Sequence, residues 1–346
     1  LEEFKKTVLR NTLIKLISVA CVFIFVKDEN DLIKYFFIYV LSNLIGNISI
    51  WMYLPKYVKK IKIKDIKILR HLKPTITLFI PQVAMQIYTV LDKTMIGMII
   101  EDKSEVGFYE QAQKIIKLLL AIATSLGTVM IPRMANTFAS GDKKKLKNYM
   151  YKSFSFILFL AFPLMFGIIS VAGKFVPIFY GEGYEKVVHI MVVISPIILA
   201  IGLSNVIGTQ YLIPTKQQKK FTISVTIGAV INVIFNMIFI NLWQSIGASI
   251  ATVIAEYSVT GIQFYLIRKE INLLDVIKLL KNYFIASIIM FVVSLSIGLL
   301  ISDDLTSIIV QVCFGIITYI IILFLMKDKI ILEGIELFKK KILKNK

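Results

Sequence analysis

The chain has 346 residues, of which 57% are hydrophobic, and its formal net charge is +18 at pH 7. Soluble domains average roughly 45–50% apolar residues with glycine counted in, so this composition excludes an ordinary soluble enzyme. The two cysteines, Cys21 and Cys313, lie inside apolar runs and predict neither a disulfide nor a metal site, and we expect no cofactor.

Apolar runs of about 20 residues recur along the chain, and each is long enough to cross a hydrocarbon core of about 30 Å. They predict an all-α, polytopic membrane protein. We expect about ten transmembrane helices, at residues 10–26, 33–54, 75–100, 106–131, 153–171, 187–210, 221–241, 245–267, 282–301 and 305–326.

The loops between these helices alternate in charge. One set is rich in Lys and Arg and comprises residues 5–10, 56–73, 143–152, 216–220, 268–281 and 327–346. The positive-inside rule makes this set cytoplasmic, so we expect a multi-pass protein of the cell (cytoplasmic) membrane with both ends of this chain in the cytoplasm. The basic charge is then an orientation signal and, secondarily, an attraction for anionic lipid, and we expect no nucleic-acid partner.

The loops of the other set are short, which restricts the function. Four of them, at 27–31, 101–105, 241–245 and 302–304, form tight helical hairpins, and a fifth spans 171–186. A membrane glycosyltransferase or polymerase would need a sizeable outer loop, and no Walker loop or metal-ligand spacing occurs. We therefore expect that the chain is not an enzyme and that its chemistry lies between the helices.

The helix expected at 75–100 carries polar residues inside its apolar run. Gln82, Gln86 and Lys93 lie on one face, because they follow helical spacing. Asp92 lies about 100° around the helix from Lys93, so these two do not pair directly. A charge at the bilayer centre costs about 2.5–3.5 kcal/mol on insertion scales, so such residues usually face a hydrated or protein-lined interior.

The helix expected at 106–131 carries a comparable stripe. Glu110, Lys114 and Lys117 share one face, and we expect this face to line the same cavity as the preceding helix. Alternatively, Asp92 and Glu110 pair with the lysines and only fix helix packing. Glu110 four residues before Lys114 also stabilises an isolated helix. Arg133 follows at the cytoplasmic end, either as an ordinary anchor or as a contact for an anionic substrate.

Later helices are poorer in charge. Glu256 is the one acid inside the helix at 245–267, and it is a candidate either for ion coupling or for a buried partner of Lys93 or Lys114. Asn232 and Asn236 have the i, i+4 spacing of interhelical hydrogen-bonding residues. Further candidates for the cavity wall are Ser204, Asn205 and Gln210.

Four runs of sequence carry a resemblance to a known family. The run LKPTITLFIPQVAMQIYTVLDKTMIG, followed by VGFYEQAQKI and LGTVMIPRMA, resembles the start of the second half of bacterial polysaccharide repeat-unit flippases. These are the Wzx-type members of the multidrug/oligosaccharidyl-lipid/polysaccharide (MOP) exporter superfamily. The later run GTQYLIPTKQQKKFTISVTIGAVINVIFNMIFINLWQSIGASIATVIAE is similar to another stretch of that family. The matches cover most of residues 72–269.

The resemblance implies a MATE-like architecture of two six-helix lobes around a central cavity. It implies that this chain is N-terminally truncated and lacks the first four family helices. The expected organisation is the end of the first lobe at 1–54, a basic inter-lobe loop at 55–74, the second lobe at 75–268, and an extra helix pair with a basic tail at 269–346.

The resemblance also implies a function. The protein would flip an undecaprenyl-pyrophosphate-linked oligosaccharide across the membrane for capsule, O-antigen or exopolysaccharide synthesis, by alternating access through a cationic cavity. Expected partners are this substrate, membrane lipid, a polysaccharide polymerase and a chain-length regulator. Lysines in a hydrated cavity would pair with the pyrophosphate.

The predicted site has three groups of residues. For headgroup binding we select Lys93, Lys114, Lys117 and Arg133, and for the polar lining Gln82, Gln86, Gln113, Asn205 and Thr252; for ion coupling or charge balance we select Asp92, Glu110 and Glu256. Three alternatives remain. A drug or ion antiporter would favour an acid-dominated cavity, a polyprenyl-linked polymerase would need a large outer loop, and a structural scaffold would leave the charge stripes unexplained.

Overall fold

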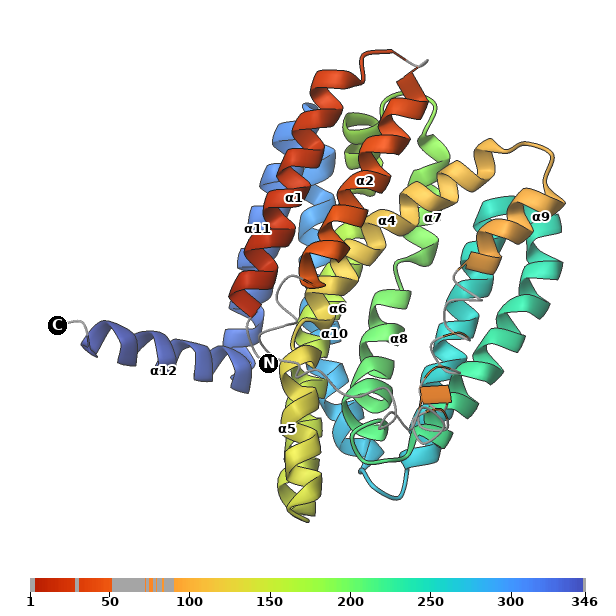
Figure 1. Cartoon of the computed structure of the whole chain (residues 1–346). Coiled ribbons are helices and arrows are strands. Elements are labelled where there is room, and N and C mark those ends of the chain that lie inside the picture. The colour runs from red at the N-terminus through yellow and green to blue at the C-terminus, as the bar shows by residue number, and fades with distance from the viewer. Residues whose placement is uncertain are drawn as a thin grey trace. The chain divides into compact units, whose positions relative to one another are not determined.

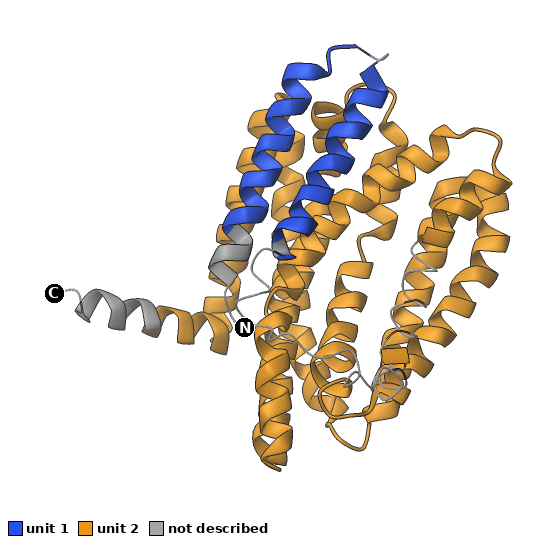
Figure 2. Cartoon of the chain, in the orientation of Figure 1, with its two compact units in different colours: residues 1–72 blue, residues 73–346 orange. Residues whose placement is uncertain are grey.

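The structure is a computed structural model that describes residues 4–28, 31–51 and 90–344, together with residues 72, 75, 76, 79 and 83. The regular elements of these residues are helical throughout (Figure 1). The chain divides into two compact units, residues 1–72 and 73–346 (Figure 2). The expected all-α class is confirmed.

The first unit contains a pair of helices, α1 (Phe4–Phe25) and α2 (Leu32–Trp51). A short link joins them, and the Asp31 side chain accepts a hydrogen bond from the Lys27 backbone at 2.9 Å. A hydrogen bond from Lys34 lowers the pKa of Asp31 below its ordinary value. Both helices expose large apolar side chains, as expected of helices that face lipid or further helices.

Within the second unit, residues 90–99 are helical and are followed by α4 (Ser104–Thr124) and α5 (Gly127–Ala139). The sequence predicts one helix at 106–131, but the structure bends by 40° between α4 and α5. Gly127 permits a close approach here, because a Cβ atom at this position would lie 2.8 Å from Oδ1 of Asn205. Most of the helix expected at 75–100 lies outside the described residues.

Helix α6 runs from Lys143 to Tyr180 and is twice the length of the predicted span 153–171. Asp142 caps it, because its carboxylate accepts a hydrogen bond from the Lys145 backbone at 2.9 Å. The next predicted helix, 187–210, is broken into three pieces: α7 (Glu185–Ile194), α8 (Ile197–Ser204) and the π-helix η4 (Asn205–Leu212). Pro196 accounts for the first break, because it has no backbone N–H to continue the helical hydrogen bonds and its ring crowds the preceding turn.

Helix α9 (Gln218–Ile267) contains two helices joined at Gln244, whose φ of 54° and ψ of −130° interrupt the helical geometry. The sequence predicts two helices in this region, at 221–241 and 245–267. Their close return requires Gly247, because a Cβ atom there would lie 1.9 Å from the Phe239 carbonyl oxygen.

The chain then forms α10 (Leu273–Leu300), α11 (Asp304–Leu325) and α12 (Lys329–Lys344). Asp303 caps α11, and hydrogen bonds from Thr306 hold the pKa of Asp303 below its ordinary value. Lys174 of α6 closes the same end, because its Nζ donates to the Ile301 carbonyl at 2.5 Å and lies 3.0 Å from Oγ of Ser307.

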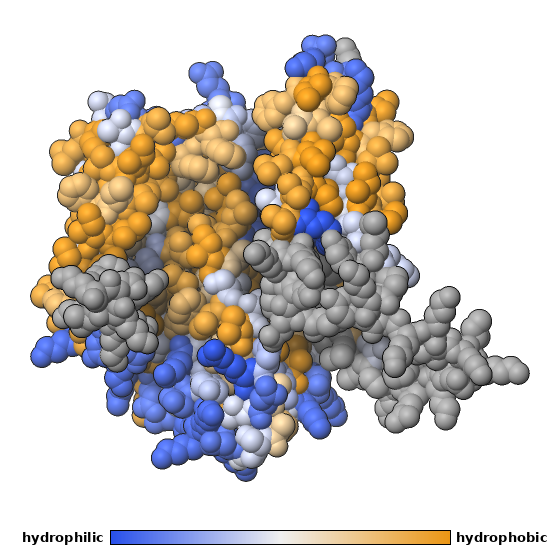
Figure 3. Space-filling view, turned by 60° about the vertical axis from the view of Figure 1, so that its left-hand side comes forward, coloured by the Kyte–Doolittle hydropathy of each residue, from blue (hydrophilic) through white to orange (hydrophobic). Residues whose placement is uncertain are grey.

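Most of these helices are long enough and apolar enough to cross a membrane. Among the described residues six spans qualify, with α9 counted as one and the pieces α7 to η4 also counted as one, and a seventh if α4 and α5 form a single bent span. Figure 3 shows hydrophobic side chains over much of the visible surface, and hydrophilic ones below them and in smaller groups at the upper end. The polytopic class is confirmed, and the helix number is close to the ten expected.

Candidate functional site

A buried carboxylate forms the centre of the candidate site. Asp92 is 1% exposed, and its Oδ2 accepts hydrogen bonds from Tyr109 OH at 2.8 Å and from Thr252 Oγ1 at 3.0 Å. Its Oδ1 accepts a hydrogen bond from Asn236 Nδ2 at 2.6 Å. Asn236 in turn donates to Asn232 Oδ1 at 3.0 Å. We call these five residues the Asp92 cluster.

The Asp92 cluster joins three elements, of which α9 is far from the other two in sequence. Asp92 comes from the helix at 90–99, Tyr109 from α4, and the other three residues from the two halves of α9. The hairpin at Gln244 brings those halves back against each other, so that Asn236 and Thr252 bind the same carboxylate. These donors to Asp92 are neutral groups, and they stabilise a negative charge on the carboxylate through hydrogen bonds alone.

A polar pocket of about 220 Å³ opens beside this cluster. Its polar lining comprises Asp92, Gln113, Lys117, Ser204, Asn205, Thr209, Thr252 and Glu256. Six of the twelve predicted site residues therefore meet at one place. Two of the lining residues are acids and one is a lysine, so the pocket within this unit is not cationic by itself.

The remaining predicted lysines surround Glu110 on the neighbouring surface. Lys93 Nζ lies 3.2 Å from Glu110 Oε1, and Lys114 Nζ lies 3.9 Å from the same oxygen. The Glu110 and Lys114 side chains are 41% and 58% exposed, so these ion pairs are weak. Lys117 is exposed one helical turn further along α4 and reaches the polar pocket. We call Lys93, Lys114 and Lys117 the lysine wall.

The other predicted residues lie elsewhere. Arg133 is exposed on α5 and does not line the polar pocket. Gln82 and Gln86 lie outside the described residues. Gln210, a further candidate for the cavity wall, is fully buried and donates to Asn205 Oδ1 at 2.9 Å.

Tyr109 belongs to the candidate site, although the sequence analysis does not single it out. It is fully buried, donates to Asp92, and receives a hydrogen bond from Gln113 Nε2 at 2.8 Å. Because tyrosine is largely apolar, it does not stand out in a hydrophobic run. Its i, i+4 spacing to Gln113 is the signal by which it could have been found.

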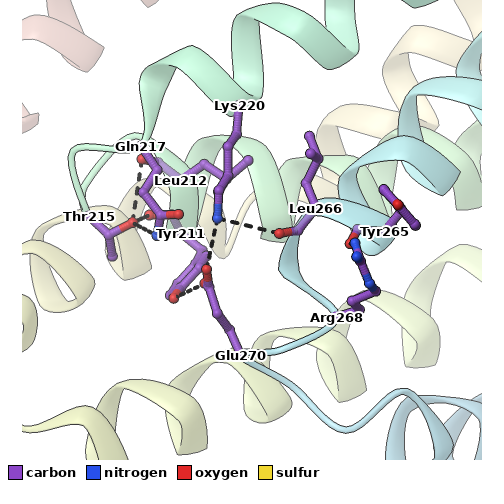
Figure 4. Close-up of polar contacts among 9 residues, drawn as sticks. All are labelled: Tyr211, Leu212, Thr215, Gln217, Lys220, Tyr265, Leu266, Arg268 and Glu270. Atoms are coloured by element: carbon purple, nitrogen blue, oxygen red, sulfur yellow. Dashed lines mark hydrogen bonds and ion pairs between the residues drawn. The ribbon is translucent and has the colours of Figure 1, made fainter.

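Two further polar clusters hold the ends of this unit together. At one end Glu105, 3% exposed, accepts from Lys186 Nζ at 2.5 Å and from Ser245 Oγ at 2.6 Å, which joins α4, α7 and α9. At the other end Glu270 accepts from Tyr211 OH and, at 2.9 Å, from Lys220 Nζ (Figure 4). Hydrogen bonds and ion pairs thus connect the helices around the pocket at both of their ends.

A second pocket, of about 420 Å³, lies between α6, α10 and α11. Its lining is almost entirely apolar and includes Phe159, Leu164, Met290 and Ile316. A pocket with this lining suits a hydrocarbon chain.

As for metals, the described residues contain no group of three or more His, Cys, Asp or Glu side chains that could share an ion.

Comparison with known proteins gives the chain's relatives. The family of polysaccharide biosynthesis proteins matches residues 2–189. The chain is 24% identical over 271 residues to the "Putative O-antigen transporter" of Escherichia coli (strain K12), covering 78% of this chain and 65% of the relative. It is 30% identical over 97 residues to the "Lipid II flippase MurJ" of Bacillus subtilis (strain 168), covering 27% of this chain and 18% of that protein.

A solved structure has the same fold. The lipid II flippase MurJ in its inward closed conformation matches with a TM-score of 0.77 at 20% identity, over 95% of this chain and 69% of that one. The chain spans less than two thirds of the length of the two curated relatives. The family match covers more than half of the chain and agrees with the resemblance to the MOP exporter superfamily. The chain belongs to the family of polysaccharide biosynthesis proteins.

Proposed function

We propose that this chain is part of a flippase that moves an undecaprenyl-pyrophosphate-linked oligosaccharide from the inner to the outer leaflet of the cell membrane. The observation that carries the proposal is the lysine wall, which lies beside a polar pocket on apolar helices. Lys93 and Lys114 share one nearby acid, Glu110, which leaves an excess of positive charge there, while Lys117 lines the pocket with Asp92 and Glu256. Such an excess at membrane depth needs an anionic partner.

The chemistry of a lipid-linked pyrophosphate fits this arrangement. Its negative charges cannot cross hydrocarbon unaided, and ammonium groups offset the loss of hydration through charge-assisted hydrogen bonds. Amide and hydroxyl groups of the polar pocket, such as Asn205 and Thr209, suit sugar hydroxyls. The apolar pocket between α6 and α11 suits part of a prenyl chain. Alternating access would come from rocking of two lobes.

Asp92 is our candidate for energy coupling. It is buried and lines the polar pocket, and its hydrogen-bond donors Tyr109 and Asn236 are neutral, so a proton or a bound cation would supply its counter-charge. Glu256, buried in the same pocket, is the second candidate. We infer transport rather than catalysis, with the basic loops on the cytoplasmic side. A polysaccharide polymerase and a chain-length regulator are proposed as partners.

A drug or ion antiporter of the same superfamily is the second candidate function. The observation that favours it is the composition of the polar pocket, which holds two acids, Asp92 and Glu256, against one lysine. An acid-dominated site suits a cationic drug better than a pyrophosphate. The two functions therefore predict opposite sensitivities to loss of the lysines.

The test replaces Lys93 and Lys114 together by Gln in the full-length protein. We expect surface polysaccharide to fall and lipid-linked intermediates to accumulate, with Lys→Arg at both positions restoring export. Lys152→Gln, an exposed lysine of α6, is the matched control at equal protein level. Normal export and normal intermediates in the double Gln variant would refute the lysine assignment. Drug efflux that requires Asp92 but not the lysines would support the antiporter.

A further inference from the structure

The joint between α11 and α12 has a defined geometry. The Lys327 backbone N–H donates to the Phe324 carbonyl at 3.0 Å, and the Asp328 N–H donates to the Leu323 carbonyl at 3.0 Å. Lys327 has a φ of 54°. This pair of hydrogen bonds around a left-handed residue is the Schellman arrangement that ends a helix, although a lysine takes the position that glycine favours. The backbone geometry at Lys327 therefore fixes the direction in which the chain continues after α11.

Asp328 then starts α12. It is 8% exposed, its carboxylate accepts from the Ile330 N–H at 2.9 Å, and its carbonyl accepts from the Leu332 N–H at 3.0 Å. Ile330 and Ile331 pack against the hydrophobic core of the unit. The first turn of α12 is thus docked, and Figure 1 shows the helix turning aside from α11 instead of continuing its direction.

The sequence of α12 is amphipathic. It contains five lysines and two glutamates, and apolar residues recur at 331, 335, 338 and 342, with the spacing of one helix face. In the part whose side chains are described, Leu332 and Ile335 are 39% and 37% exposed. The described chain therefore leaves the apolar face partly uncovered, next to a concentration of positive charge.

We propose that α12 lies in the membrane–water interface at the end of α11 and binds anionic phospholipid headgroups of that leaflet. Two observations select lipid as the occupant. The spanning helix α11 ends at the joint, so α12 begins where a bilayer surface would be, and four of its five lysines lie in its last six residues. Such a helix buries its apolar face at the headgroup boundary and attracts anionic lipid. The proposal does not depend on the transported substrate.

The experiment uses the whole chain in lipid nanodiscs. In a background with Cys21→Ser and Cys313→Ser, a nitroxide label is attached at Ile335→Cys or, as the matched control about 200° around the helix, at Glu333→Cys. Discs contain phosphatidylglycerol with phosphatidylcholine, or phosphatidylcholine alone. In the anionic discs we expect the label at 335 to be accessible to oxygen and shielded from a water-soluble nickel complex, and the label at 333 to show the reverse.

Replacing lysines 339–341 by Gln tests the role of charge. Each lysine near an anionic surface contributes roughly fivefold to binding, so shielding at 335 should fall to its value in phosphatidylcholine, and Arg at the three positions should restore it. Equal shielding at 333 and 335, or shielding that ignores both lipid charge and the lysines, would overturn the proposal. Shielding that depends on the number of chains per disc would instead assign the face to a second copy and would also overturn it.

Discussion

Replacing Asp92 by Ala or by Asn separates the hydrogen-bonding role of this carboxylate from its charge. The carboxylate accepts three hydrogen bonds, from Tyr109, Asn236 and Thr252. Hydrogen bonds to a charged group contribute about 1.5–3 kcal/mol each, which gives an upper limit of about 9 kcal/mol for their loss. Each donor has a second partner, however, and Thr252 for example also bonds to the Ala248 carbonyl at 2.9 Å.

The cost of Asp92→Ala should therefore be well below that limit. The donors can pair again, and the variant no longer buries a charge whose desolvation costs several kcal/mol. We expect the free energy of unfolding to fall by about 2–4 kcal/mol. Asp92→Asn keeps the shape, and the hydroxyls of Tyr109 and Thr252 can rotate to accept from the new amide, so its loss should be about 1 kcal/mol or less.

The assay combines unfolding in mixed detergent micelles with polysaccharide export in cells. We expect Asp92→Asn to unfold nearly as the unchanged protein does and yet to lose export, because the charge is gone. Glu105→Gln is the control, since Glu105 is also buried but lies in the cluster with Lys186, away from the pocket. It should lose stability with less effect on export. Normal export by Asp92→Asn, or unchanged stability of Asp92→Ala, would refute this reasoning.

Two further substitutions test the elements that hold the second unit together. Gly247→Ala places a methyl group against the backbone carbonyl of the facing half of α9, so we expect the hairpin to open and the yield of folded protein in detergent chromatography to fall several-fold. An unchanged chromatographic profile would mean that the two halves of α9 are far enough apart at Gly247 to accept a methyl group. Glu270→Gln weakens the bonds from Tyr211 and Lys220, and because the ion pair is about one-third exposed we expect a loss of only about 1 kcal/mol in detergent unfolding. If the exposed control Lys269→Gln loses as much stability, the loss comes from the change in net charge and not from the contacts of Glu270.

Much of the fold could be predicted because apolar run length reports membrane crossing directly. The hairpin at Gln244 and the pair α10–α11 lie where the sequence places them. The sequence predicts helix ends less well. Hydropathy identifies the apolar segment that crosses the membrane, whereas a helix can continue beyond that segment. Helix α6 continues from Lys143 through a polar segment capped by Asp142, which the apolar run does not reveal. Breaks such as the one between α4 and α5 are set by packing against other helices.

The candidate site was predictable where a regular helix carries it. Spacing on α4 predicts that Glu110, Lys114 and Lys117 share one face, and in the structure Lys114 pairs with Glu110 while Lys117 lines the polar pocket. The pairing of Asp92 with amides and hydroxyls was not predictable, since it depends on how α9 folds back on itself. The orientation of Gln210 was not predictable for a different reason, because the backbone around it does not follow the period of 3.6 residues.

The π-helix η4 has a consequence for the helical phase of this region. In an α-helix residues five apart point about 140° away from each other, so Asn205 and Gln210 could not form their hydrogen bond. In η4 each turn closes one residue later, and the bond forms against Gly127. The segment thus holds the equivalent of one inserted residue. Deleting that residue would restore a regular α-helix and leave the later side chains facing as before, because the wide turn absorbs the extra residue, but it would remove the hydrogen bond between Asn205 and Gln210.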